Sequence, residues 1–410
     1  MYKTYQNSTA KSTTQIFFAS RNCTILKMNI LHVTTFLQGG AGKVIVDLAK
    51  AFSKLGHSIS VACTKDPVQG YGNYPEHLET LEQDKIPLIF LDSTFSRVLA
   101  KNLHASRTLH SSIIQGYPDL IHSHSSIPSM VGIDATAKLN KEIPIIQTMH
   151  GWGINKTKEQ ERQDIEILNS VNHVVSVSKS SENLLLEKEI LNKNKSVIYN
   201  GVETTLSKIE VSEDKHLLKL KSLRKEGKKI IGVIGTVDAR KNQALILEAL
   251  ALLPNNLEFH AFFVGEGEDL NAYREKTEKL ELSSKVTFTG YKKVARLYTK
   301  ESDLLISASV SEGAAPIVIL EAFSEKTLVL ASDTQENMEA INDGYNGYLF
   351  RSGNAASLSE KINISLSSRS ITKIKNNAFD YFQSKYTLKS MIENYLSLYL
   401  KLTDSNELIS

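Results

Sequence analysis

The stretch that decides the fold is Ser311-Glu-Gly-Ala-Ala-Pro-Ile-Val-Ile-Leu-Glu-Ala-Phe323. It follows Asp303-Leu-Leu-Ile-Ser-Ala-Ser309, an apolar run that we predict to be a buried parallel strand. The small residues and the proline predict a turn, and the apolar residues after them predict a helix. Ligands of open α/β sheets bind beyond the carboxyl ends of the strands, where helix N–H groups also attract anions. The stretch therefore predicts a ligand site that includes Glu312, in the turn, and Glu321, on the helix.

Predicted strands and helices alternate from Met28 onward in two consecutive halves, which is typical of parallel βαβ units. The expected strands are 28–35, 58–63, 120–124, 143–149, 173–178 and 195–202 in the first half, and 229–236, 258–265, 285–290, 303–309, 327–332 and 347–350 in the second. The predicted fold class is therefore α/β, with two Rossmann-like parallel-sheet domains that face a central crevice.

Changes in composition divide the chain further. Residues 1–27 are rich in Ser, Thr, Lys and Asn, and we expect an extension that is either disordered or not translated, with Met28 as the native start. The remaining parts expected are Rossmann-like domains at 28–203 and 229–378, a charged linker with a helix of its own at 204–228, and a C-terminal helix at 379–410.

Charge and cysteine content exclude several classes of protein. A net charge of +3 and a pI near 8.5 are only mildly basic, so no nucleic-acid partner is expected. Cys23 and Cys63 form no pair or metal pattern, which fits a reducing compartment. No apolar run reaches the ~18 residues of a membrane span, and Gln15–Ala19 is too short for a signal-peptide core. We expect a cytoplasmic protein, either free or peripheral on the inner face of the membrane.

The two glutamates and their turn resemble the donor-sugar motif of glycosyltransferase family 4 (glycosyl transferases group 1), which are retaining enzymes with the GT-B fold. In that family a Ser-Glu-Gly turn is followed by Leu-Glu-Ala, as here. The resemblance implies that Glu312 binds hydroxyls of the transferred sugar and that Glu321 holds the nucleotide ribose. It also implies that Gly313, Ala314 and Ala315 line the donor site. Eight residues separate the glutamates here, where the family usually has seven, and we expect a wider turn to absorb the extra residue.

Glycine-containing loops match the family in the same order along the chain. Gly39-Gly40-Ala41-Gly42 follows the first strand, where glycine lets backbone amides approach a ligand. In the family this loop lies beside the acceptor and the donor phosphates, so Gly39 is expected at the acceptor and Gly40 at the donor. Gly265 and Gly290 end later strands, in loops that border the nucleotide base in the family.

A basic loop, Gly235-Thr236-Val-Asp-Ala-Arg240-Lys241, follows the first strand of the second half. The resemblance assigns Lys241 to the donor diphosphate. This agrees with the need of two phosphates for fixed positive charge and with the partial charge at the start of the next helix. The family often has an arginine where this sequence has Thr236, and Arg240 is expected to replace that charge.

Histidines end two strands of the first half. The resemblance places His150 beside the reacting sugar, where an imidazole can donate to a hydroxyl or polarise the leaving group. It places His124 and Trp152 on the acceptor side. A purely structural role for His122 and His124 stays open as an alternative. A zinc site at these two histidines is not expected, because no third ligand appears at a usable spacing.

The resemblance also implies a mechanism. His150, Glu312 and Lys241 are the expected catalytic residues, and a nucleotide-diphosphate sugar, most often a UDP-sugar, is the expected co-substrate. The sequence contains no Asp-x-Asp pair, which disfavours the metal-dependent GT-A plan, so neither a metal nor a cofactor is expected. Attack on the face from which the diphosphate leaves would retain the anomeric configuration. The last helix is expected to cross back onto the N-terminal domain.

The expected function is transfer of a hexosyl or N-acetylhexosaminyl group to a glycan, a lipid-linked acceptor or another surface-polysaccharide acceptor. Three alternatives stay open. A GT-B nucleotide-sugar 2-epimerase would need no acceptor. A non-catalytic nucleotide-sugar-binding module would agree with Thr236 and with the lengthened glutamate spacing. An NAD-dependent oxidoreductase is the general interpretation of two Rossmann-like domains, and the missing third glycine of the dinucleotide fingerprint counts against it.

Overall fold

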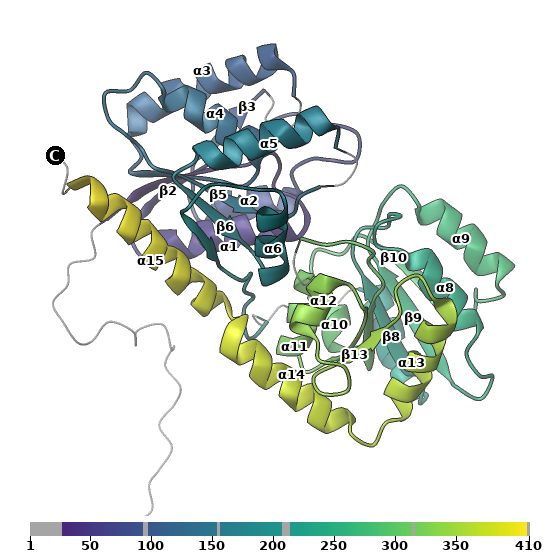
Figure 1. The fold of residues 1–410 in the computed structure, drawn as a ribbon. Helices are drawn as coiled ribbons and strands as arrows, with labels where there is room; N and C mark the ends of the chain where they lie inside the picture. The colour runs from purple at the N-terminus through teal and green to yellow at the C-terminus, as the bar shows by residue number, and fades with distance from the viewer. Residues whose placement is uncertain (1–26, 93–96, 154–155, 207–213, 314–315, 408–410) are drawn as a thin grey trace, which may run out of the picture.

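The computed structural model describes residues 27–92, 97–153, 156–206, 214–313 and 316–407 (Figure 1). Two parallel sheets, each with its own helices, form a first and a second domain, as the sequence predicts. Their strand orders are β3-β2-β1-β4-β5-β6-β7 and β10-β9-β8-β11-β12-β13. The strands are β1 (Asn29–Val33), β2 (Ser58–Thr64), β3 (Leu88–Leu91), β4 (Leu120–Ser123), β5 (Ile145–Met149), β6 (His173–Ser176), β7 (Lys195–Val197), β8 (Lys229–Ile234), β9 (Phe259–Val264), β10 (Val286–Gly290), β11 (Leu304–Ser307), β12 (Leu328–Ser332) and β13 (Tyr348–Phe350).

Helices cover both faces of each sheet. They are α1 (Gly39–Lys54), α2 (Pro75–Gln83), α3 (Leu99–Gly116), α4 (Ser126–Thr136), α5 (Lys158–Ser170), α6 (Lys179–Glu187), α7 (Lys215–Lys225), α8 (Gln243–Ala251), α9 (Leu270–Lys279), α10 (Arg296–Lys300), α11 (Ile317–Ser324), α12 (Gln335–Ala340), α13 (Ala355–Ser367), α14 (Ile371–Lys385) and α15 (Leu388–Glu407). Every predicted strand is present. The prediction missed β3, because this four-residue edge strand is only partly buried and carries no long apolar signal.

Burial on both faces explains why the strands are continuous apolar runs. Successive side chains of a strand point to opposite faces. Ile30 of β1 therefore packs in the cluster that contains Phe52 of α1, whereas Leu31 packs in the cluster that contains Leu109 of α3. The second sheet repeats this plan, with Leu304 of β11 facing the α8 side and the next residue facing the α11 side.

The last helix crosses from the second domain to the first, which confirms the predicted crossing. Figure 1 shows α15, in yellow, running from the end of α14 along the first domain. Its buried residues Tyr395 and Tyr399 belong to the same apolar cluster as Phe52. The crossing helix begins at Leu388 rather than at residue 379, because residues 379–385 still belong to α14, which packs on the second sheet.

Between α14 and α15 the chain makes a short backbone contact with Val202. The Val202 N–H donates to the Tyr386 carbonyl at 3.0 Å, and the Leu388 N–H donates to the Val202 carbonyl at 2.9 Å. Gly201 makes this approach possible, since a Cβ atom there would lie 2.4 Å from the Thr387 carbonyl oxygen. The chain segments that connect the two domains are thus joined to each other.

The segment predicted as a linker contains α7. Leu217, Leu220 and Leu223 of this helix pack with Ile230 and Phe262, so α7 is part of the second domain. No helix in the described part of the chain is both long enough and apolar enough to cross a lipid bilayer.

Candidate active site

A cavity of about 780 Å³ lies between the two domains, beyond the carboxyl ends of their strands. Both domains contribute to its wall. The residues that line it include His150, Gly151, Trp152 and Ser181 from the first domain, and Asp238, Arg240, Glu312 and Gly313 from the second. The cavity is therefore where the sequence predicted a ligand site.

The turn after β11 is held directly against the first domain. A Cβ atom on Gly313 would lie 1.7 Å from the carbonyl oxygen of His150, so only glycine fits this approach. The Gly313 carbonyl accepts hydrogen bonds from the hydroxyls of Ser178, at 3.2 Å, and of Ser181. These serines lie at the start of α6 and were not predicted, because nothing in their local sequence indicates a contact with a distant turn.

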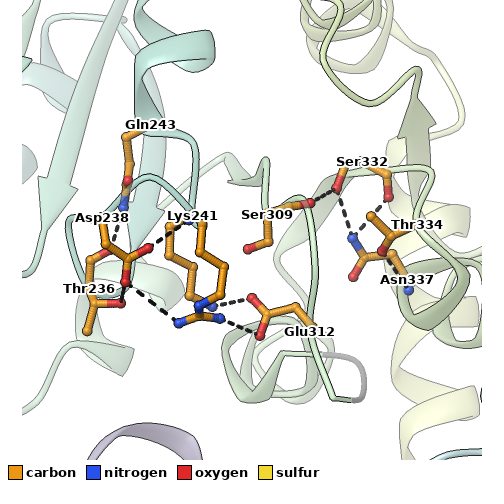
Figure 2. A network of polar contacts seen from close by, with 10 residues as sticks. Thr236, Asp238, Lys241, Gln243, Ser309, Glu312, Ser332, Thr334 and Asn337 are labelled. Carbon is orange, nitrogen blue, oxygen red and sulfur yellow. Dashed lines mark hydrogen bonds and ion pairs between the residues drawn. The ribbon is translucent and has the colours of Figure 1, made fainter. Parts of the chain in front are cut away.

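Glu312 faces the two predicted cations. Its carboxylate accepts a hydrogen bond from Arg240 at 3.0 Å. It also forms an ion pair with Lys241, and Figure 2 shows these two side chains pointing toward each other. The Glu312 side chain is only 11% exposed, against 36% for Arg240. The carboxylate thus lies where two converging cations would hold an anion, and Arg240 contacts the same carboxylate as Lys241. That Arg240 replaces the family arginine stays a prediction.

Asp238 organises the basic loop before α8 (Figure 2). Its carboxylate accepts from the Thr236 hydroxyl and from the Lys241 N–H, both at 2.8 Å. Gln243, the first residue of α8, donates to the Thr236 carbonyl at 2.6 Å. Thr236 therefore braces the loop without adding charge. The sequence shows Asp238 inside the basic motif, but only the fold reveals this bracing role.

The end of β12 supports the turn from the other side. The Ser332 hydroxyl donates to the Ser309 carbonyl at 2.6 Å, and Asn337 donates to the Ser332 carbonyl at 2.9 Å (Figure 2). Ala314 and Ala315, predicted in the donor site, lie outside the described residues. The extra residue between the glutamates belongs to the same stretch, 313–320, and Glu312 and Glu321 are described on either side of it.

The loops predicted to border a nucleotide base pack closely against the basic loop. A Cβ atom on Gly265 would lie 1.9 Å from the Gly235 carbonyl oxygen, and Gly265 has φ +146. The Gly265 N–H donates to the Gly290 carbonyl at 3.0 Å. Glycine at 265 thus lets the ends of β8, β9 and β10 approach one another beside the cavity.

Glu321 is not among the residues that line the cavity. Burial raises the pKa of its carboxyl, and the positive charges of Lys43 and Arg296 oppose that rise. Lys43 comes from α1 of the first domain and donates to Asp47 at 2.7 Å. Gly40, also in α1, approaches the start of α11, since a Cβ atom there would lie 3.1 Å from Ile317. Gly39 has φ +57, and a Cβ atom placed there would meet none of the counted atoms within 4 Å. Helix α11, which carries Glu321, and the start of α1, which carries Gly40, thus lie next to each other although they belong to different domains.

Four histidines of the first domain lie close together at the strand ends. His124 Nδ1 is 3.1 Å from His150 Nε2, and His124 Nε2 is 3.0 Å from Nδ1 of His32, on β1. His122 uses both ring nitrogens in other contacts, with Tyr399 at 2.6 Å and with the Thr148 hydroxyl at 2.7 Å. His124 is 5% exposed and contacts His150. Its predicted role at the acceptor stays a prediction.

Burial keeps these histidines neutral at physiological pH. It lowers the pKa of His150 to about 4 and that of His32 to about 3. It also holds the pKa values of His122 and His124 well below the usual range, with a further contribution from the neighbouring imidazoles. A neutral imidazole offers one N–H donor and one nitrogen acceptor.

The sequence argument against a zinc site, that no third ligand accompanies His122 and His124 at a usable spacing, overlooked His32. His32, ninety residues earlier in the chain, brings a ring nitrogen within 4.8 Å of one on each of them. Sequence spacing missed it because β1 and β4 are neighbours only in the folded sheet. Both nitrogens of His122 are already hydrogen-bonded, so the contacts describe a hydrogen-bonded network rather than a set of free metal ligands.

Trp152 forms part of the first-domain wall of the cavity. Its indole N–H donates to Glu161 at 3.0 Å, and the ammonium of Lys156 lies 4.2 Å from the ring centroid. These two contacts fix the orientation of the indole ring in the cavity wall, and its role in acceptor binding stays a prediction.

Comparison with known families agrees with this geometry. The family model described as "Glycosyl transferases group 1" matches residues 214–381, and the model described as "Glycosyltransferase Family 4" matches residues 38–206. Together the two matches include most of both domains.

Curated relatives carry related descriptions. The chain is 27% identical over 289 residues to an uncharacterized glycosyltransferase of Methanocaldococcus jannaschii. The aligned part covers 65% of this chain and 71% of that protein. It is 26% identical over 348 residues to the alpha-monoglucosyldiacylglycerol synthase of Streptococcus pneumoniae, which spans 79% of this chain and 75% of that protein.

Among solved structures, HepE of Anabaena in complex with UDP-glucose matches with a TM-score of 0.77 and 21% identity, over 91% of this chain and 99% of that one. A glycosyltransferase of Rickettsia africae matches with a TM-score of 0.75 and 23% identity, over 92% and 99%. At these identities the structures show the shared fold.

Two Rossmann-like domains around one cavity, with this ordered set of motifs, define a glycosyltransferase with the GT-B fold and a nucleotide-sugar donor. The chain belongs to glycosyltransferase family 4.

Proposed function

We propose that this enzyme transfers a hexosyl or N-acetylhexosaminyl group from a UDP-sugar to a surface glycan or lipid-linked acceptor, with retention of the anomeric configuration. The observation that carries the proposal is the convergence of Arg240 and Lys241 on one anion position, now held by Glu312, in a cavity that also contains His150. A nucleoside diphosphate would take that position and displace the carboxylate.

The two cations, Arg240 and Lys241, would stabilise the leaving group. When the bond between the anomeric carbon and the diphosphate breaks, negative charge develops on the phosphate oxygens. Lys241 and Arg240 are fixed positive charges at this point, and the N–H groups at the start of α8 add partial positive charge. We propose that these groups stabilise the departing diphosphate without a metal ion.

The bond changes balance without a covalent enzyme intermediate. The acceptor hydroxyl oxygen forms a bond to the anomeric carbon on the face that the diphosphate leaves. Its proton passes to a diphosphate oxygen, and the free nucleoside diphosphate is the second product. We propose that Glu312, once displaced from the cations, binds hydroxyls of the sugar, and that Trp152 and Gly39 of the first domain bind the acceptor; Trp152 and Glu312 both line the cavity.

Two relatives support the choice of acceptor class. The curated name of the Streptococcus pneumoniae relative is that of a glycolipid synthase. A Campylobacter jejuni relative, 29% identical over 214 residues, is named an N-acetylgalactosaminyltransferase that acts on a diphospho-undecaprenol sugar. A lipid-linked acceptor would require a cytoplasmic enzyme that docks peripherally on the inner face of the membrane, and we include that location in the proposal.

The test is a donor screen followed by product analysis. The melting temperature is measured with UDP-, GDP- and ADP-sugars and with NADH, since a ligand at 100 times its dissociation constant adds ~2.7 kcal/mol of stability. The stabilising donor is then incubated with lipid-linked and free glycan acceptors, and the anomeric linkage is read by NMR. Stabilisation by NADH alone would overturn the proposal. A free epimerised sugar without acceptor would identify the 2-epimerase, and binding without turnover on any acceptor would favour the binding module.

A further inference from the structure

Three histidines form a single row that ends at the cavity. His150, in the cavity wall, contacts His124, which contacts His32 on the interior strand β1. The rings are close to parallel, with 23° between the planes of the first pair and 16° between those of the second. The rings therefore meet edge to edge through their nitrogens, which is the geometry of N–H···N hydrogen bonds.

Each contact in the row must join one N–H to one bare nitrogen, because all three imidazoles are neutral. The protons can then be arranged in only two ways. Either every N–H points from His32 toward His150, or every N–H points the other way. The arrangement is settled by the groups at the two ends of the row.

The inner end favours the first arrangement. His32 is fully buried, and its Nε2 has no hydrogen-bond partner within the described part of the chain. If the protons pointed inward, this atom would be a buried N–H without an acceptor, and such orphaned donors are rarer in proteins than under-satisfied acceptors. A bare Nε2 at this end leaves the Nδ1–H of His32 to donate to His124.

At the outer end of the row, His150 has one ring nitrogen that is not bonded to His124. With the protons pointing outward, His124 donates through Nδ1–H to Nε2 of His150, and the proton of His150 lies on Nδ1. This second nitrogen makes no hydrogen bond within the described residues, and His150 is a partly exposed residue of the cavity wall. It is the atom of the row that a ligand can reach.

We propose that His32 and His124 are positioning residues that fix His150 in the Nδ1-protonated form, so that it donates a hydrogen bond to an oxygen of the bound donor sugar. This inference rests on the proposed function for the identity of the ligand. His32 and His124 do not line the cavity, yet they would act on the ligand through His150. In this form His150 is a hydrogen-bond donor rather than a proton acceptor.

Two substitutions of His124 test the proposal, and they differ in whether the new side chain has an N–H donor. In His124→Asn the side-chain amide keeps an N–H near the position of Nδ1, whereas His124→Leu fills similar space without a donor. We expect kcat to fall by ~10-fold or more in His124→Leu, the loss of about one hydrogen bond to the reacting sugar, and to be partly restored in His124→Asn. KM for the donor should change little in either variant. His173→Leu is the matched control, because His173 is a buried strand histidine whose contact is with Ser196 outside the row.

Nitrogen NMR of histidine-labelled protein reads the tautomer directly, and His150→Gln identifies the His150 signals. The expected result is a protonated Nδ1 and a bare Nε2 in the wild type, with the Nε2–H form appearing in His124→Leu. A protonated Nε2 of His150 in the wild type would overturn the proposal, and so would equal kcat values for the Asn and Leu variants. If no sugar nucleotide stabilises the protein, the proposed function fails whether or not the tautomer is as expected.

Discussion

At the scale of single residues, the charge arrangement around Glu312 suggests a site that is occupied by the protein's own carboxylate until a donor arrives. Arg240 and Lys241 both contact this carboxylate, and Lys241 is the less exposed of the two cations. A ligand that binds the cations must therefore replace an existing ion pair, which lowers its apparent affinity.

The first prediction concerns the lysine. Lys241→Ala should weaken binding of UDP and of the donor alike, by ~1.5 to 3 kcal/mol, because it removes one charge-assisted hydrogen bond to phosphate. Isothermal titration with UDP measures the loss. Lys276→Ala is the control, since Lys276 pairs with Glu248 outside the cavity wall. Unchanged UDP affinity in Lys241→Ala would remove this residue from the site.

The second prediction separates the glutamate from the cations. Glu312→Gln should lower kcat by more than ~10-fold, because it weakens a contact with the sugar that changes during transfer. The same variant should bind UDP up to about fivefold more tightly, since the competing ion pair is worth ~1 kcal/mol. Kinetics and UDP titration of one preparation test both parts. Weaker UDP binding would show that Glu312 holds the nucleotide instead of competing with it.

At the scale of elements, two strand ends and one turn determine the shape of the site. The turn after β11 carries Glu312, and its Gly313 contacts the strand end that carries His150. The β1–β4 pair brings His32 and His122 side by side. Small displacements of these elements would therefore change the cavity before they change the fold.

The third prediction tests the turn. In Gly313→Ala the new methyl group would overlap the His150 carbonyl, so the turn must move away from the first domain. We expect a raised KM for the donor and a lower kcat with the melting temperature nearly unchanged, because the contact lies between domains rather than in a core. Gly116→Ala is the control, as the nearest atom there lies 4.0 Å away. Wild-type kinetics in Gly313→Ala would contradict the observed approach.

The fourth prediction concerns pH. The pKa of His32 is about 3 in the folded protein and near 6.5 when unfolded, so between these values the unfolded chain binds the extra proton. Stability should thus be complete above pH 6.5 and fall as pH decreases, by up to ~1.4 kcal/mol per pH unit from this histidine. Urea unfolding at pH 7, 6 and 5 measures the slope, which His32→Asn should reduce and the substitution of exposed His104 by Asn should not. Equal slopes in wild type and His32→Asn would contradict the assignment.

At the scale of the whole molecule, polar side-chain contacts join the two domains. Glu339 of α12 accepts from the N–H groups of Lys179, at 2.8 Å, and Ser180, at 3.0 Å, at the start of α6. On another side, Lys293 pairs with Glu79 of α2 at 2.7 Å. Because a carboxylate at a helix start is favoured by the helix dipole, the α12–α6 contact should contribute to closure.

The fifth prediction is that Glu339→Gln shifts the ligand-free protein toward an open form. Small-angle scattering should give a larger radius of gyration than for the wild type, and saturating UDP-sugar should reduce the difference. Glu248→Gln, which alters an ion pair within the second domain, serves as the control. A radius equal to that of the wild type without ligand would mean that the other contacts suffice for closure.

The sequence by itself determined the α/β class, the two-domain order and the motif residues. Its apolar runs and its turns are local signals. A run such as Asp303–Ser309 predicts a buried strand without any knowledge of the strands beside it. The family resemblance also predicted that Arg240 and Lys241 act together, because Lys241 matches the family lysine and Arg240 was expected to replace the arginine absent at Thr236.

Only the tertiary structure decided which distant residues meet. His32 joins His124 because β1 and β4 are neighbouring strands, Ser181 reaches Gly313 because the domains face each other, and the crossing helix starts at Leu388 because Val202 pairs with the chain just before it. Each of these contacts joins segments more than 90 residues apart. No local periodicity encodes such a contact, since it depends on strand order and on domain placement, which arise only when the whole chain folds.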